Sequence, residues 1–194
     1  SGTYINKERA NTHHLLVRYL LAELETADLR LVDTQSGGLH NAIPREGYAV
    51  CAVPFAEKEQ MRIDLNVLAA QAAEEYSVTE KEMEFYLESQ PAAAKAIDRK
   101  TAQAMLLSLQ AVHNGVFAMS QDLDWLVETS SNLASIHKLD GIVEVTTSQR
   151  SSVGSACGYM AEVIRAAIRL GGAEVETNEG YPGWKMNATN AIVR

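Results

Sequence analysis

Two short segments combine residue types that could bind and polarise a small polar substrate. The first, residues 37–46, reads Gly-Gly-Leu-His-Asn-Ala-Ile-Pro-Arg-Glu and places Asn41 in a turn that Pro44 restrains. An amide held in a rigid turn can donate a hydrogen bond toward a neighbouring cavity. An Asx-turn, in which the asparagine side chain bonds to nearby backbone, explains the same pattern without a binding role.

The second segment, residues 146–152, lies where a strand should pass into a helix, and it contains Arg150. A guanidinium can grip a carboxylate through two parallel hydrogen bonds. The alternative is a surface arginine near a helix start. A cation at a helix N-terminus opposes the helix dipole, so that alternative is itself slightly unusual.

Other common catalytic patterns are absent from the sequence. There is no phosphate-binding glycine loop, no serine nucleophile elbow and no closely spaced set of metal ligands. His13 and His14 are adjacent on a helix and point about 100° apart, so a solvated helix face is expected for them. His40, His113 and His137 are isolated and are expected at the surface or at caps. No metal site is therefore predicted in this chain.

Hydrophobic periodicity predicts the elements that must position Asn41 and Arg150. Helices are predicted for residues 6–27, 56–76, 92–112 and 153–170. Strands are predicted for residues 29–34, 47–53, 81–87, 141–147 and 173–177, with a further strand-like run at 126–129.

An internal repeat supports this division. Leu31-Val32-Asp33-Thr34 recurs as Leu126-Val127-Glu128-Thr129, an offset of 95 residues, and each run precedes a loop, a glycine-led strand, a helix and a closing strand. Chance similarity is the alternative to duplication. Two strand-strand-helix-strand units, about 1–90 and 91–180, predict an α+β fold whose antiparallel sheet carries helices mainly on one face.

Composition narrows the class of protein. The 194 residues are 46% apolar and carry a net charge of −8, which disfavours nucleic acid and anionic membranes as partners. No apolar run is long enough to span a membrane. The two cysteines, Cys51 and Cys157, are too few for a disulfide framework and are expected to be buried, reduced thiols in a cytoplasmic protein.

Four motifs, in order along nearly the whole chain, carry a family resemblance. They are Asn41-Ala42-Ile43-Pro44-Arg45-Glu46, His113-Asn114-Gly115-Val116, Val127-Glu128-Thr129-Ser130-Ser131-Asn132-Leu133 and Tyr181-Pro182-Gly183-Trp184. Together they resemble the lid domain of the aminoacylhistidine dipeptidases, co-catalytic zinc exopeptidases related to carnosinases. The opening Ser1-Gly2 resembles the last two residues of a His-Ser-Gly motif that begins with a lid histidine, although a cloning remnant explains these two residues equally well.

The resemblance implies roles for the two residues singled out above. Asn41 matches the lid asparagine that stabilises the oxyanion of the scissile peptide, and Arg150 matches the lid arginine that binds the free C-terminal carboxylate of the substrate. In simpler relatives both residues lie in one unit. Here they fall in different halves, and the duplicated positions, near Phe55 and Ile136, carry neither.

The resemblance also implies a catalytic domain outside this chain. Two zinc ions and the general base would belong to that domain, where a zinc-bridged hydroxide attacks the peptide carbonyl. Residues 1–180 would form the lid domain and residues 181–194 an exit segment toward the catalytic domain. The expected partners are that catalytic domain, a dipeptide substrate of the Xaa-His type such as β-Ala-His, and a second copy in a homodimer.

Two other interpretations stay open at this point. One is a stand-alone module that binds a small carboxylate or mediates dimerisation without catalysis. The other, a self-sufficient hydrolase, lacks a recognisable nucleophile or metal constellation. A Ser-Gly opening without an initiator methionine fits an excised domain better than a stand-alone protein. The chain alone is expected to be inactive because nothing in its sequence matches the zinc ligands or the general base.

Overall fold

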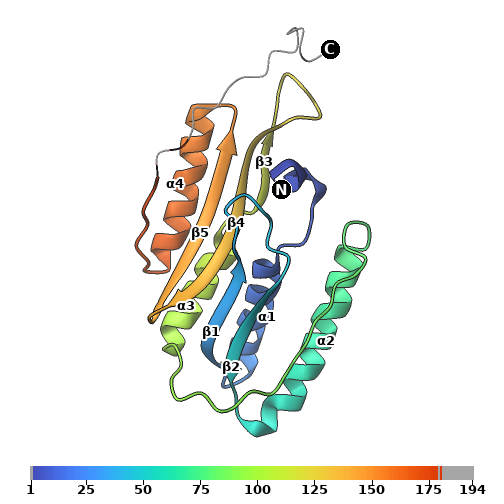
Figure 1. The fold of residues 1–194 in the computed structure, drawn as a ribbon, viewed down its shortest axis with the longest axis vertical. Coiled ribbons are helices and arrows are strands. Elements are labelled where there is room, and N and C mark those ends of the chain that lie inside the picture. The colour runs from blue at the N-terminus through green and yellow to red at the C-terminus, as the bar shows by residue number, and fades with distance from the viewer. Residues whose placement is uncertain (1, 179, 181–194) are drawn as a thin grey trace.

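A five-stranded antiparallel sheet forms the centre of the fold in the computed structural model, which describes residues 2–178 and 180 (Figure 1). The strands are β1 (Arg30–Gly37), β2 (Gly47–Ala52), β3 (Gly115–Met119), β4 (Val127–Leu139) and β5 (Ile142–Ser151). Strand β5 pairs along one edge of β4. Strands β3 and β1 share the other edge of β4, one after the other, and β2 pairs with the outer side of β1.

The two halves of the chain join at a short seam between β1 and β4. Two residue pairs, Ser36 with Ile136 and Gly37 with Ser135, make up this seam. Gly37 has a φ of 70°, and a Cβ there would overlap the carbonyl oxygen of Ala134. Glycine is therefore required at Gly37 both for its backbone conformation and for the close approach of the two strands.

Three helices lie side by side across one face of the sheet (Figure 1). They are α1 (Thr12–Thr26), α3 (Arg99–Ala111) and α4 (Gly154–Leu170). Asn11 caps α1 and Asp98 caps α3, and each side chain accepts a hydrogen bond from the first turn of its helix. The fourth helix, α2 (Lys58–Glu75), packs beside α1, where the Tyr19 hydroxyl donates to the Met61 carbonyl oxygen at 2.8 Å. Two short 3-10 helices, η1 (Gly2–Lys7) and η2 (Phe55–Glu57), complete the described elements.

The core lies between the sheet and this helical layer. It draws on both halves of the chain, with Val17, Tyr19, Leu20, Leu24, Leu29, Leu31, Met61 and Leu68 from the first and Ala102, Leu106, Leu109, Val112, Leu133, Ile136, Met160, Ile164 and Ala167 from the second. One cluster spans both, so the halves fold around a common core rather than as two separate bodies. Among the described elements, no helical layer covers the opposite face of the sheet (Figure 1).

The α+β fold class and the antiparallel sheet are confirmed, but the predicted repeat unit is wrong in its last element. Residues 81–87 and 173–177 form no strand. Phe85 packs against the core, which accounts for the alternating pattern, yet its segment has no ladder partner among the described residues. The order strand, strand, helix does recur, as β1, β2 and α2 and as β4, β5 and α4.

Three further boundaries differ from the prediction. The segment after residue 129, expected as a loop, continues as strand β4 and turns into β5 at Asp140 and Gly141, whose φ angles are 50° and 83°. Two consecutive positive φ angles are typical of a tight two-residue hairpin. Strand β3 was not predicted. The helix expected from residue 92 begins at Arg99, because the Ile97 amide is already committed to the Leu31 carbonyl oxygen at 2.7 Å.

Buried polar residues also differ from expectation. His13, expected on a solvated helix face, is only 1% exposed and packs in the interior. Cys51 and Cys157 are free thiols as expected, but both are half-buried rather than buried. In the part of the chain that the structure describes, no helix is both long and apolar enough to cross a membrane. The expected exit segment, residues 181–194, lies outside the described residues, so the division at residue 180 stays a prediction.

Candidate functional site

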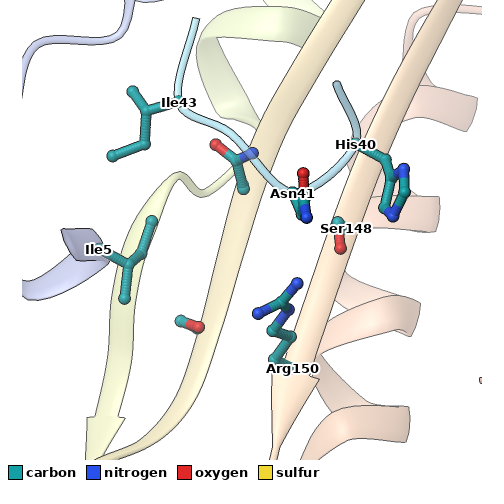
Figure 2. A pocket seen from close by; sticks show the side chains of 8 residues that line it. Ile5, His40, Asn41, Ile43, Ser148 and Arg150 are labelled. Carbon is teal, nitrogen blue, oxygen red and sulfur yellow. The ribbon is translucent and has the colours of Figure 1, made fainter. Parts of the chain in front are cut away.

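The loop between β1 and β2 carries Asn41 across the face of the sheet opposite to α1, α3 and α4 (Figure 2). The loop is fixed at three points, beginning with Gly37 at the seam. The Pro44 carbonyl oxygen accepts hydrogen bonds from both the backbone amide and the hydroxyl of Thr12, each at 3.2 Å. Between these points, the Asn132 side-chain amide donates to the Ala42 carbonyl oxygen at 2.8 Å. Strand pairing before Asn41 and two hydrogen-bonded contacts after it therefore hold its backbone in place.

The Asn41 side chain itself is left free. It is exposed, and it makes no hydrogen bond with any other described residue, so the bond expected of an Asx-turn is not formed. The turn is closed instead by the Ala42 amide, which donates to the Leu39 carbonyl oxygen at 3.1 Å. The Asn41 amide is consequently available to donate to a ligand.

Arg150 lies within β5, on the same sheet face as the Asn41 loop. It pairs with Ser130 of β4, and α4 begins only at Gly154, so Arg150 is a strand residue and not part of a helix start. The helix dipole therefore has no bearing on its charge. Among the described residues, Arg150 has neither a carboxylate partner nor a side-chain hydrogen bond. An exposed guanidinium without a counter-charge is suited to an external anion.

Asn41 and Arg150, 109 residues apart in the sequence, line one pocket. Figure 2 shows the Asn41 amide and the Arg150 guanidinium pointing toward each other, with Ser148 and His40 to one side and Ile5 and Ile43 to the other. The full lining consists of Ile5, His40, Asn41, Ile43, Ser130, Asn132, Ser148 and Arg150. The structure thus brings together the two residues that the sequence singled out.

The pocket is small. The space that a water molecule can occupy in it is about 20 Å³, which is room for roughly one water. Ligand pockets that enclose a small molecule are usually at least about 300 Å³. The described residues therefore supply one wall of a binding site rather than a complete enclosure.

Three polar strand residues of this wall, and His40 of the loop, were not predicted as site residues. Ser130 and Asn132 come from β4 and Ser148 from β5, and they reach the pocket because the ladder pairs Ser130 with Arg150 and Asn132 with Ser148. This arrangement becomes visible only because β4 pairs with β5 along most of its length. The sequence signal was the polar run Thr129-Ser130-Ser131-Asn132, which resembled a loop but forms a strand.

A buried network beneath the pocket connects α1 to β4. Asn11, the cap of α1, donates to the Leu133 carbonyl oxygen and to the Asn114 side-chain oxygen, both at 2.9 Å. The same Asn114 oxygen accepts from the Leu133 amide at 3.0 Å. The His113-Asn114 motif therefore serves to hold the middle of β4, directly beside Asn132.

An ion pair fixes the far end of the Asn41 loop. Both Arg45 guanidinium nitrogens contact the Glu80 carboxylate, whose side chain is 5% exposed, and Arg9 lies 3.7 Å from the same carboxylate. The hydrogen bonds from Arg45 hold the pKa of Glu80 below its usual value, although burial opposes them. A charged arginine is thus needed at this position to keep Glu80 ionised in the interior.

Among its described residues, the wall contains no carboxylate and no thiol. Within residues 2–178 and 180, no three His, Cys, Asp or Glu side chains gather closely enough to hold a metal ion, so the donor set does not fit zinc. Burial raises the pKa of the Cys51 thiol to about 12, so this thiol is not an activated nucleophile. The arrangement is suited to binding a carboxylate at Arg150 and a carbonyl oxygen at Asn41.

Comparison with known proteins shows what the chain is similar to. No protein-family model matches the chain. The chain is 32% identical over 193 residues to the cytosol non-specific dipeptidase of Escherichia coli (strain K12), and the match covers 100% of this chain and 40% of that protein. It also matches the crystal structure of aminoacylhistidine dipeptidase from Vibrio alginolyticus with a TM-score of 0.92 and 30% identity, covering 97% of this chain and 39% of the other. The chain spans about two fifths of the length of each, and it is therefore homologous, over its whole length, to one part of this dipeptidase family.

Proposed function

We propose that this chain is the substrate-clamping lid domain of a longer dipeptidase. A single observation carries the proposal: Asn41 and Arg150, whose side chains have no hydrogen-bond partner among the described residues, come from different halves of the chain to one incomplete pocket. A free dipeptide carries a carbonyl oxygen and a terminal carboxylate separated by only three atoms of its backbone. Asn41 and Arg150 are the complementary groups for these two acceptors.

In this proposal each residue has one task. Asn41 donates a hydrogen bond to the carbonyl oxygen as negative charge develops there, an interaction whose removal typically costs roughly 10²- to 10³-fold in kcat. Arg150 binds the terminal carboxylate, orients the peptide bond and excludes peptides whose carboxylate lies further along the chain. Zinc has no matching donor set in the described part of the chain, so we assign no step through a metal to these residues.

The substrate class follows from the carboxylate clamp. We propose dipeptides with a free C-terminus, and Xaa-His dipeptides such as β-Ala-His as the first to be tested, because one relative is named an aminoacylhistidine dipeptidase. The other relative is named a non-specific dipeptidase, which favours a site that recognises backbone groups over one particular side chain. The cytosolic name of that relative supports a cytoplasmic location.

The decisive experiment replaces Arg150 in the longer enzyme and compares two forms of one substrate. Arg150→Ala should lower kcat/KM on a free dipeptide by roughly 10- to 150-fold, since a charge-assisted hydrogen bond contributes about 1.5 to 3 kcal/mol. It should change kcat/KM on the C-terminally amidated dipeptide far less, because the amide presents no carboxylate. Arg30→Ala, on β1 and paired with Asp28 at 2.9 Å, is the matched control and should affect neither substrate.

Equal losses of Arg150→Ala on both substrates would exclude the clamp. A second measurement tests the lid assignment itself: the chain alone should neither hydrolyse β-Ala-His nor bind zinc, whereas the longer enzyme should do both. Activity in the chain alone would show a catalytic centre here. Binding of small carboxylates by the chain alone, in a protein without peptidase activity, would favour a stand-alone binding module.

A further inference from the structure

Asn132 lines the pocket and has an unused hydrogen-bond acceptor. Its side chain lies on β4 and is only 9% exposed, and it lines the pocket together with Asn41 and Arg150. Its Nδ2 donates to the Ala42 carbonyl oxygen at 2.8 Å. Its Oδ1 is buried and has no hydrogen-bond partner among the described residues.

The orientation of this amide is fixed by its donor. If the side chain were turned by 180°, Oδ1 would face the Ala42 carbonyl oxygen, and two acceptors would oppose each other. The observed orientation is therefore the favourable one, and in it Oδ1 does not face the Ala42 carbonyl oxygen. Buried side-chain acceptors almost always have a partner, so an orphaned one in a pocket indicates a missing donor.

The neighbours of Asn132 suggest which donor this is. Asn132 is hydrogen-bonded to the residue after Asn41, and through the ladder it pairs with Ser148, two residues from Arg150. A dipeptide has only one backbone donor between its scissile carbonyl group and its terminal carboxylate, and that donor is the peptide N–H.

Asn41 and Asn132 can also approach a bound peptide group from different sides. In a trans peptide the carbonyl oxygen and the N–H point in opposite directions, so two recognising side chains must come from different sides. Asn41 belongs to the loop that crosses the sheet face, and Asn132 rises from the sheet under that loop, where it holds the Ala42 carbonyl oxygen. One asparagine can thus serve the carbonyl oxygen while the other serves the N–H.

We propose that Asn132 Oδ1 accepts a hydrogen bond from the peptide N–H of the bound dipeptide, and so acts as a third recognition point beside Asn41 and Arg150. This inference rests on the proposed lid function. It adds a requirement that the carboxylate clamp does not make: the substrate must have a secondary amide. Dipeptides ending in proline or an N-methylated residue, and esters of the same shape, cannot make this bond.

The test uses Asn132→Ala in the longer enzyme and two substrates that differ at a single atom. One is a dipeptide and the other is the depsipeptide in which an ester oxygen replaces the peptide N–H. Asn132→Ala should lower kcat/KM on the dipeptide about tenfold more than on the depsipeptide, which corresponds to about 1.4 kcal/mol. Losing the contact with Ala42 weakens the hold on the Asn41 loop for both substrates alike, so that effect cancels in the ratio.

Three variants serve as controls. Asn132→Asp keeps an acceptor and loses the donor to Ala42, so it should restore the amide-to-ester ratio even if both rates fall. Asn41→Ala and Arg150→Ala should lower both rates equally, because both substrates keep the carbonyl oxygen and the carboxylate. If Asn132→Ala does not fold, Asn132→Ser, which is polar but too short to reach the substrate, should give the same change in the ratio.

The outcomes separate the two proposals. An equal loss on the amide and the ester in Asn132→Ala or Asn132→Ser would overturn the role of Asn132 and would leave a bound water as the partner of Oδ1. Unchanged rates in both Asn41→Ala and Arg150→Ala would instead overturn the lid function itself. A selective loss on the amide, restored by Asn132→Asp, is the result that we expect.

Discussion

Replacing the buried His13 should remove a large part of the acid sensitivity of this fold. His13 lies in the first turn of α1, is 1% exposed, and neither ring nitrogen has a hydrogen-bond partner within the described chain. Burial, and then the proximity of His14, lower the pKa of His13 from 6.5 to about 4. The Ala134 carbonyl oxygen near the ring opposes this shift without reaching hydrogen-bond geometry. A positive charge here would also oppose the dipole at the start of α1.

The sign of the effect on stability follows from proton binding. Between pH 6.5 and about pH 4 the unfolded chain holds a proton on His13 that the folded chain does not, so the folded state loses stability as the pH falls through this range. At about 1.4 kcal/mol per pH unit of difference, the loss reaches about 3 kcal/mol at pH 4. In His13→Leu this contribution should vanish, because leucine fills much of the same space and does not titrate.

Urea denaturation of the wild type and of His13→Leu, at several pH values from 7 down to 4.5, measures this directly. The difference in free energy of unfolding between the two proteins should move in favour of His13→Leu by about 2 kcal/mol between pH 7 and pH 5. His40→Leu, which removes a histidine from the exposed loop, controls for the change in histidine content. Parallel pH profiles for the wild type and His13→Leu would refute the assignment of acid sensitivity to His13.

Two further substitutions test how the Asn41 loop is held. Arg45→Gln should lower the free energy of unfolding by about 2 kcal/mol, because it leaves Glu80 in the interior without its main partner; Arg45 is half exposed, which keeps the cost below that of a fully buried pair. The exposed Arg30 provides the control in urea melts, and a loss in Arg30→Gln as large as in Arg45→Gln would contradict this account. Gly37→Ala should cost more than about 2 kcal/mol, since its φ of 70° and the adjacent backbone of β4 both exclude a side chain, whereas Gly38→Ala has open space. Thermal melting that shows equal stability for Gly37→Ala and Gly38→Ala would mean that the seam tolerates a side chain.

The helices and the two hairpins were largely predictable from local patterns. The apolar stripes of α1, α2 and α4 and the glycine-led β2 and β5 follow directly from spacing, because these elements bury one face against a single core. The closing strands were not predictable in the same way. Alternation over residues 81–87 reports that one side of an extended segment meets the core, as Phe85 does, and says nothing about whether a neighbouring strand exists.

The first half of β4 forms a strand although it lacks the alternation of apolar and polar residues that predicts one. Thr129, Ser131 and Asn132 are buried, yet they are polar, and their burial depends on partners such as Ser151 and Ala42 that only the tertiary structure supplies. Without the extent of β4, the ladder that brings Asn132 beside Ser148 could not be inferred from the sequence.

Two residues of the candidate site, Asn41 and Arg150, were predicted from the sequence, whereas Asn132 was not. Asn41 and Arg150 stood out because a turn restrained by proline and an arginine at a predicted strand-to-helix junction are visible in sequence. Asn132 was present in one of the recognised motifs, but its importance depends on a free oxygen and on a bond to the Ala42 carbonyl. The sequence alone does not show that Asn132 Oδ1 lacks a hydrogen-bond partner in the folded chain.

The two-residue seam between β1 and β4 has a consequence for substrate length. Asn41 lies in the loop that connects β1 and β2, and Arg150 lies in the hairpin of β4 and β5. The distance between their side chains therefore depends on how these two hairpins are joined. A slip at the seam would shift one hairpin by about 3.3 Å per residue, and a slip of a single residue would also turn the side chains of the slipped strand to the other face of the sheet. For the roles proposed here, the pairs Ser36–Ile136 and Gly37–Ser135 would set the distance between the carbonyl-binding and carboxylate-binding groups. Under this proposal, the preference for dipeptides over tripeptides depends on the register of the strands. Changing that preference would require a shift of a strand and not only the substitution of a side chain.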